Sequence, residues 1–200
     1  KSGKVRDLYE YADDNILISH TDRLSSFDRN ICDIRGKGNI LCLLTKWWFD
    51  RTNHIIPNHV VKMIDTCLVV KKCTVIPIEF VVRGYITGST STSLWTHYNK
   101  GERTYCGISF PDGLLKNQRL DTPVLTPTTK DEHDEPLSCE DIVSRGILSQ
   151  EDLDFIKGKA MELFTYGQQV SEERGLILVD TKYEFGRDSD GNIILIDEVH

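Results

Sequence analysis

The sequence LILVDTKYEFGRDSDGNIILIDEV, residues 176–199, contains the pattern that decides the fold. Two β-prone runs, 176–185 and 192–199, flank the turn sequence DSDG, and an Asp-Gly pair favours a tight hairpin turn. We therefore expect these residues to form two antiparallel strands.

Charged side chains alternate with apolar or neutral ones along the first of these strands. Asp180, Lys182 and Glu184 should share one face, because successive side chains of a strand point to opposite sides. If Asp197 on the returning strand meets Glu184 above the sheet, the two carboxylates would form the hard oxygen site that Mg²⁺ prefers. Lys182 would then suit a phosphate. The pattern alone favours a plainer interpretation, a solvated strand face with cross-strand ion pairs.

The order of the other predicted elements sets the fold class. Strands are expected over 5–9, 15–20, 59–63, 66–70 and 78–82, the first two as an antiparallel hairpin. Helices are expected over 40–49 and 93–99 and after the capping sequences that begin at Ser138 and Ser149. Strands precede most of the helices, which argues for an α+β fold rather than a doubly wound parallel sheet.

The helix after Ser149 has the clearest pattern. Its apolar or small residues recur at steps of three and four: Leu153, Ile156, Ala160, Leu163, Gly167 and Val170. Gly175 is a natural stop. By contrast, residues 110–135 are rich in Pro, Gly, Thr and Asp, which predicts a long irregular loop of the kind that often carries function.

Pro77 marks the expected boundary between two lobes. Proline cannot donate to a sheet ladder, and it biases the residue before it towards an extended conformation. We therefore expect an N-terminal lobe over residues 1–76 and a second lobe over 77–200.

Composition excludes several classes of protein. With 24 basic and 31 acidic residues the net charge is −7, which is unfavourable for non-specific nucleic-acid binding. No apolar run approaches the roughly 18 residues of a membrane helix, and the first residues lack the apolar core of a signal peptide. The six cysteines show no C-x-x-C spacing, so free thiols in the cytoplasm or an organelle stroma are expected. The chain begins with Lys1 rather than Met, so we expect residues before it.

Two segments have residues suited to phosphate. In Gly3-Lys4-Val5-Arg6, glycine permits close backbone approach and Lys4 supplies charge, although a basic strand end is the commoner meaning. The sequence RGYITGS, residues 83–89, is the stronger candidate. Arg83 offers a guanidinium fork, and Ser89 would sit at a helix N-terminus. A glycine turn followed by a serine N-cap explains RGYITGS about as well.

The polar loop contains TPTTK (126–130) and HDE (133–135). A Ser-His-Asp hydrolase is excluded because no G-x-S-x-G sequence occurs. A histidine-based metal site lacks a second suitably spaced histidine. Taken alone, these segments indicate a solvated loop.

Taken together, nine segments resemble the SAICAR (phosphoribosylaminoimidazole-succinocarboxamide) synthetase family, in the family's order and from end to end, with the plant-like single-activity branch closest. They are GKVRDLY (3–9), TDRLSSFDR (21–29), GKG (36–38), PIEFVVRGYITGS (77–89), SLWTHYNKG (93–101), LTPTTK (125–130), HDE (133–135), LVDTKYEFG (178–186) and IDEVH (196–200).

The resemblance implies a two-lobed α+β fold with ATP in the cleft between an antiparallel β-rich lobe and a larger α+β lobe. It implies an ATP-dependent ligase of purine biosynthesis, with Mg²⁺ as cofactor. The partners would be ATP, carboxyaminoimidazole ribotide (CAIR) and L-aspartate, which condense through an acyl phosphate to SAICAR, ADP and phosphate. A homo-oligomer is compatible with it, and neither nucleic acid nor membrane is implied.

The resemblance also implies roles for individual residues. ATP would contact Gly3, Lys4, Val5, Arg6, Lys72, Thr74, Val75 and Glu184. The ribotide and aspartate would contact Arg83, Ser89, His133, Asp134 and Lys37, with Asp28 near the cleft. Mg²⁺ would be held by Glu184 and Asp197. The catalytic residues would be Lys182, Lys4 and Asp134.

One departure and two alternatives remain. Family sequences continue past IDEVH into a TPDSSR stretch whose arginine helps to bind substrate, so we expect this chain to lack part of the site. A kinase would share the lobed ATP architecture, but neither H-R-D-L-x-x-x-N nor D-F-G occurs. A non-catalytic nucleotide-binding module is disfavoured by the retention of Lys4, Lys182, Glu184 and Asp197.

Overall fold

The computed structural model describes residues 1–12, 14–26, 29–131 and 134–200. The chain forms two compact units: Lys1–Val75 with Gly186–Val199, and Ile76–Phe185 with His200. They are called unit 1 and unit 2 below, and each is described by itself. Whether they serve as a nucleotide lobe and a substrate lobe stays a prediction.

Unit 1 is built on a four-stranded antiparallel sheet in the order β1-β2-β6-β5. Its strands are β1 (Arg6–Tyr11), β2 (Asn15–His20), β6 (Cys67–Lys71) and β5 (Val60–Ile64). A small hairpin of β3 (Arg23–Ser26) and β4 (Arg29–Asp33) leads to helix α1 (Lys37–Thr52). Ile18, Cys42, Leu68 and Val70 form a buried cluster that includes residues of both the sheet and the helix.

The start of α1 is fixed by a carboxylate and a glycine. Asp22 accepts hydrogen bonds from the backbone N–H groups of Gly36 and Gly38, at 3.1 and 2.9 Å, which satisfies donors that a helix N-terminus leaves unpaired. A Cβ at residue 38 would lie 2.6 Å from the carbonyl oxygen of His20. Only glycine fits there without backbone movement.

The last strands of the chain return to unit 1. Strand β12 (Asp180–Arg187) ends beside the short strand β7 (Thr74–Val75), and β13 (Ile193–Ile196) follows. Asp188 accepts hydrogen bonds from the backbone N–H groups of Asp190 and Asn192, which closes the turn. The predicted hairpin turn is thus confirmed, although β12 begins and ends later than the predicted 176–185 and β13 is shorter than 192–199.

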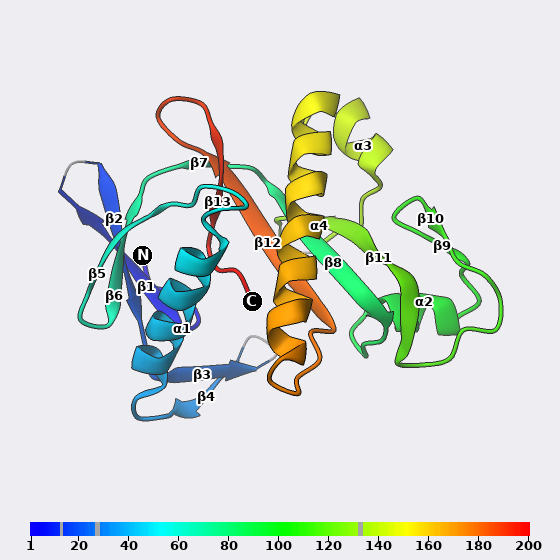
Figure 1. Cartoon of the computed structure of the whole chain (residues 1–200), viewed down its shortest axis with the longest axis horizontal. Helices are drawn as coiled ribbons and strands as arrows, with labels where there is room; N and C mark the ends of the chain where they lie inside the picture. Colours follow the sequence, from blue (N-terminus) through cyan, green and yellow to red (C-terminus); the bar gives the residue numbers. More distant parts are fainter. Residues whose placement is uncertain (13, 27–28, 132–133) are drawn as a thin grey trace. The chain divides into compact units, whose positions relative to one another are not determined.

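Unit 2 contains a sheet in the order β11-β8-β12, made of β11 (Gln118–Thr129), β8 (Ile78–Ile86) and the first part of β12. Helix α4 (Gln150–Glu172) lies across one face (Figure 1). A Cβ at Gly84 of β8 would meet Phe164 and Gln168 of α4 at 3.0–3.2 Å, so the even-numbered residues of β8 face the helix.

The remaining elements of unit 2 are short. They are α2 (Leu94–Asn99), β9 (Thr104–Tyr105), β10 (Ile108–Ser109) and α3 (Cys139–Ser144). Ser138 forms a capping box with Asp141, and the Ser149 side chain caps α4, as the sequence predicted. All six predicted apolar positions of α4 are buried.

The prediction of an irregular loop over 110–135 is wrong for its middle, where β11 forms. Pro123 and Pro127 suggested a loop, but β11 lies at an end of the strand order, and its register shifts between Arg119 and Val124. The carbonyl of Pro127 accepts from Leu137, so this residue's backbone faces away from β8 and no ladder donor is missing.

The antiparallel sheets and separate helices confirm the α+β class. Within the described part of the chain, no helix combines the length and the apolar character needed to span a membrane.

Candidate active site

The face of the unit 2 sheet opposite α4 is polar. The odd-numbered residues of β8 point to it, including Glu79 and Arg83. In the strand register Val81 lies opposite both Thr126 of β11 and Lys182 of β12, so these side chains share the same face. Three neighbouring strands therefore contribute polar groups to one surface.

Glu184 lies at the centre of a chain of ion pairs on this face. Its Oε1 accepts from the ammonium of Lys182 at 2.6 Å, and its Oε2 pairs with the ammonium of Lys130. Lys182 also donates to Glu79 at 2.9 Å. Two carboxylates and two ammonium groups thus form one connected, formally neutral cluster, which we call the Glu184 cluster.

The depth of the Glu184 cluster differs from one side chain to the next. The Glu184 side chain is only 5% exposed, whereas those of Lys130 and Lys182 are 37% and 38% exposed. A buried carboxylate is costly unless it is paired and hydrogen-bonded. The shared face of Lys182 and Glu184 is confirmed, but the expectation of a solvated face is wrong at Glu184.

Arg83 is held on the same face by neutral and charged partners. Its Nε donates to the Thr126 hydroxyl at 2.8 Å, and Nη2 donates to the Thr92 carbonyl at 3.4 Å. Asp180 lies opposite Arg83 in the register, with 3.8 Å between Nη1 and the carboxylate. The guanidinium is nearly buried and oriented by one short bond, which suits a site for an anion.

Ser89 is placed differently from the prediction. The N-cap of α2 is Ser93, four residues further on, so Ser89 does not lie at a helix N-terminus. Gly88 has a φ of +104°, and a Cβ there would lie 2.3 Å from Cβ of Ser93. The glycine turn is therefore required by the backbone, and Ser89 is exposed beyond it.

In unit 1, residues 3–6 form a tight turn. The backbone N–H of Gly3 donates to the carbonyl of Arg6 at 2.8 Å, and a Cβ at residue 3 would lie 2.8 Å from that oxygen. Arg23 clamps the turn, since it donates to the carbonyls of Gly3 and Lys4 and to both oxygens of Asp7. Hydrogen bonds from Arg23 and Ser2 lower the pKa of Asp7 to about 2.

Asp197 lies just beyond the end of β13. Its φ is +68°, so strand alternation stops before it, and its predicted place on the returning strand is not supported. Its carboxylate pairs with Arg6 at 2.7 Å, and Glu198 contacts the same guanidinium at 3.2 Å. Asp197 and Glu184 belong to different units, so their joint metal site stays a proposal.

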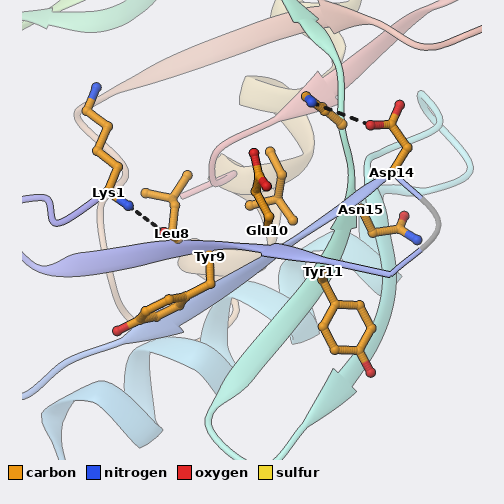
Figure 2. A pocket seen from close by; sticks show the side chains of 9 residues that line it. Lys1, Leu8, Tyr9, Glu10, Tyr11, Asp14 and Asn15 are labelled. Carbon is orange, nitrogen blue, oxygen red and sulfur yellow. Dashed lines mark hydrogen bonds and ion pairs between the residues drawn. The ribbon is translucent and has the colours of Figure 1, made fainter.

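A cavity of unit 1 lies along the β1–β2 hairpin and measures about 780 Å³. Figure 2 shows Leu8 and Glu10 projecting to one side of β1, and Tyr9 and Tyr11 to the other. Lys72 also lines this cavity, and its ammonium lies 3.4 Å from Asp14. Of the residues proposed to contact ATP, Lys72 is the one that this cavity includes.

The other predicted residues are more scattered. Lys4 is exposed, Thr74 and Val75 form the exposed strand β7, and the ammonium of Lys37 donates to the carbonyl of Arg23 at 3.0 Å. Asp134 is exposed, with a φ of +47°. His133 and Asp28 lie outside the described residues.

Sequence reasoning missed four residues that the structure places in these clusters. They are Glu79, Lys130, Thr126 and Arg23. All four fall inside three of the quoted segments, PIEFVVRGYITGS, LTPTTK and TDRLSSFDR, so a signal was present. Their partners lie 16 to 103 residues away along the chain, and local patterns do not show such pairs.

Comparison with known proteins places this geometry in a family. The model of the SAICAR synthetase family matches residues 1–200. The chain belongs to the SAICAR synthetase family. The phosphoribosylaminoimidazole-succinocarboxamide synthase of Legionella pneumophila (strain Paris) is 56% identical over 200 residues, and the chloroplastic enzyme of Arabidopsis thaliana is 57% identical. Each alignment covers 99% of this chain but only 64% and 48% of the relative, so the chain spans about two thirds or less of these SAICAR synthetases.

Solved structures agree with the assignment to the SAICAR synthetase family. A SAICAR synthase from Saccharomyces cerevisiae, complexed with SAICAR, superposes with a TM-score of 0.87 at 32% identity over 100% of this chain and 72% of that one. A type-2 SAICAR synthetase in complex with ADP gives a TM-score of 0.82 at 24% identity, over 100% and 79% of the two chains. The latter likeness concerns the fold alone.

Proposed function

We propose that the full-length protein is the ATP-dependent ligase that joins L-aspartate to CAIR and releases SAICAR, ADP and phosphate. Family membership supports this activity. The observation that carries it is the buried Glu184, held by two lysines on the same sheet face as the oriented Arg83. Such a face can receive a cation-bound polyphosphate and a sugar phosphate side by side.

Arg83 and Ser89 are proposed to bind the ribotide phosphate. The Nε of Arg83 is engaged by Thr126, whereas the contacts of its Nη atoms with the described residues are long, at 3.4 and 3.8 Å. Those atoms can therefore turn to phosphate oxygens, for which a guanidinium is well shaped. His133, Asp134 and Lys37 remain the proposed contacts of the imidazole and of aspartate.

ATP is proposed to contact unit 1 through the turn of residues 3–6 and through Lys72, Thr74 and Val75. The turn is kept in shape by Arg23 and has an exposed lysine, Lys4. The SAICAR synthetase solved with ADP shows that a protein of this fold binds an adenine nucleotide.

Mg²⁺ is the proposed cofactor, with Glu184 and Asp197 as ligands. Their carboxylate oxygens are the hard donors that this ion prefers, and the counter-charges of Glu184 are two lysine ammonium groups. No group of three His, Cys, Asp or Glu among the described residues converges as a metal cluster, so phosphate and water oxygens would complete the coordination. The ion would neutralise charge on the transferring phosphoryl group.

The proposed reaction needs no protein nucleophile. A carboxylate oxygen of CAIR attacks the γ-phosphorus of ATP, and ADP leaves. The aspartate amine then attacks the acyl carbon, loses a proton, and displaces phosphate, which carries away the former carboxylate oxygen. Lys182 and Lys4 would stabilise negative charge on the transferring group, and Arg83 would fix the ribotide. Asp134 is the proposed acceptor of the amine proton.

A coupled assay of ADP release on the full-length protein tests this proposal. ADP should form only when ATP, CAIR and aspartate are all present, and Glu184→Ala or Asp197→Ala should abolish turnover while circular dichroism shows an intact fold. ADP release without aspartate would indicate a kinase or ATPase, and full activity of both variants would refute the metal assignment.

The proposed setting is the cytoplasm or an organelle stroma, and the Arabidopsis relative is named as chloroplastic. A homo-oligomer is also proposed, and light scattering of the full-length protein measures its oligomeric state.

A further inference from the structure

Lys130 has a role in the Glu184 cluster that the proposed reaction does not assign. It follows directly after β11, and its ammonium pairs with Oε2 of Glu184. The backbone N–H of Lys130 donates to the carbonyl of Pro77 at 3.2 Å, which ties this end of β11 to the start of β8. The base of the side chain is therefore fixed while its end reaches the buried carboxylate.

The two lysines differ in what else holds them. Lys182 has a second carboxylate partner, Glu79, at 2.9 Å. Among the residues that the structure describes, Glu184 is the one carboxylate within ion-pair distance of Lys130. If a cation took an oxygen of Glu184, Lys182 would keep Glu79, whereas Lys130 would need a new anion.

The different exposure of the side chains in the Glu184 cluster makes the ammonium groups accessible to that anion. Glu184 is 5% exposed and lies beneath side chains that are more than a third exposed. An anion that arrives from solvent meets ammonium groups first. A divalent cation needs the carboxylate oxygens that those ammonium groups occupy, and it repels them.

We propose that Lys130 is an exchangeable counter-ion for Glu184. Without ligand it neutralises the buried carboxylate. When a polyphosphate arrives with its divalent cation, the cation takes the carboxylate and the Lys130 ammonium turns to a phosphate oxygen. Every charge keeps a partner before and after the exchange, so no uncompensated buried charge forms. This inference rests on the proposed function, since it takes Glu184 as the cation ligand.

The exchange predicts opposite effects on two ligands, because loss of Lys130 should strengthen the binding of a free metal ion and weaken the binding of a metal-free nucleotide. In full-length Lys130→Met, Mn²⁺ alone should bind about three- to tenfold more tightly, because no ammonium competes for Glu184. ADP without metal should bind more weakly by a similar factor. Lys130→Arg keeps the charge and should restore both values towards those of the unaltered protein.

The measurements are electron paramagnetic resonance of free Mn²⁺ and calorimetric titration with metal-free ADP. Lys116→Met is the matched control, since it removes an exposed lysine of the same unit outside the Glu184 cluster. Glu184→Gln in the same titrations checks that Mn²⁺ binds at this carboxylate, and Lys130→Gln provides a second neutral variant should methionine disturb the fold.

Unchanged or weaker Mn²⁺ binding in the folded neutral variants would overturn the exchange. If ligase activity is normal at the same time, the proposed function survives and only the role of Lys130 falls. If Glu184→Gln leaves Mn²⁺ binding unaltered, Glu184 is not the cation ligand. Both the exchange at Lys130 and the proposed metal ligand are then refuted. Absence of ligase activity together with the expected shifts would remove the proposed reaction and retain the exchange.

Discussion

Thr126→Val isolates the short hydrogen bond that orients Arg83. Thr126 is fully buried, and its hydroxyl accepts from Nε of Arg83 at 2.8 Å while donating to the carbonyl of Val81 at 3.3 Å. Valine has nearly the same shape as threonine, so the substitution removes polarity and leaves little change in volume. The other contacts of Arg83 are longer, at 3.4 and 3.8 Å, and replace the lost bond poorly.

The expected loss follows from the charge on the donor. A hydrogen bond to a charged group contributes about 1.5–3 kcal/mol, and this one is short and buried, so the free energy of unfolding should fall by about 2 kcal/mol. In a protein of this size that corresponds to a decrease in Tm of about 4–8 °C. If Arg83 binds the ribotide phosphate, KM for CAIR should also rise, because the fork is less well oriented.

Thr128→Val is the control, because it makes the same change two residues further along β11 on the same face. Thr128 is also buried but does not bond to Arg83. Thermal unfolding of both variants and steady-state kinetics against CAIR give the comparison. Equal losses of stability in the two variants, with unchanged KM for CAIR, would refute the view that Thr126 positions the guanidinium.

Two further predictions concern stability. Gly38→Ala should lower the free energy of unfolding by about 1–3 kcal/mol, since the new Cβ would lie 2.6 Å from a backbone carbonyl oxygen. Gly158→Ala, in open space within α4, should raise it by about 0.5–1 kcal/mol. Urea denaturation of the two variants gives the comparison, and stabilisation by both changes would contradict the packing argument. Burial lowers the pKa of His20 to about 4 and that of His59 to about 3. As the pH falls, both imidazoles are therefore protonated in the unfolded chain before they are protonated in the folded one. The free energy of unfolding should fall as the pH drops below about 6.5, by about 2 kcal/mol per histidine at pH 5. Denaturation midpoints at pH 7.5 and 5 should therefore differ less for His20→Gln than for the unaltered protein, and an equal drop in both would exclude His20 as a cause.

Local patterns predicted much of the fold correctly. The caps at Ser138 and Ser149 and the apolar spacing of α4 were confirmed because they depend on neighbours within a few turns of a helix. The error at β11 has a local cause as well. Pro127 signals a loop in any short window, and only the position of its strand at the end of the order makes that proline harmless.

Local sequence patterns likewise predicted some features of the candidate site and missed others. Alternation in DTKYEF correctly put Lys182 and Glu184 on one face, since strand geometry fixes that relation within three residues. Whether Glu184 lies in solvent or beneath two lysines does not follow from alternation. The sequence of β12 is equally compatible with both, and the plainer interpretation was right about cross-strand ion pairs but wrong about the solvation of Glu184.

By itself the sequence determined the helices and their caps, the hairpin turn, the face on which the charges of β12 lie, and the family through its ordered motifs. Only the tertiary structure decided that Lys130 reaches Glu184 across 54 positions and that Thr126 reaches Arg83 across 43. Those pairs depend on which strands become neighbours and in which register. That choice is made by burial of the apolar face of the sheet against α4, which leaves the polar groups on the opposite face to find partners among themselves.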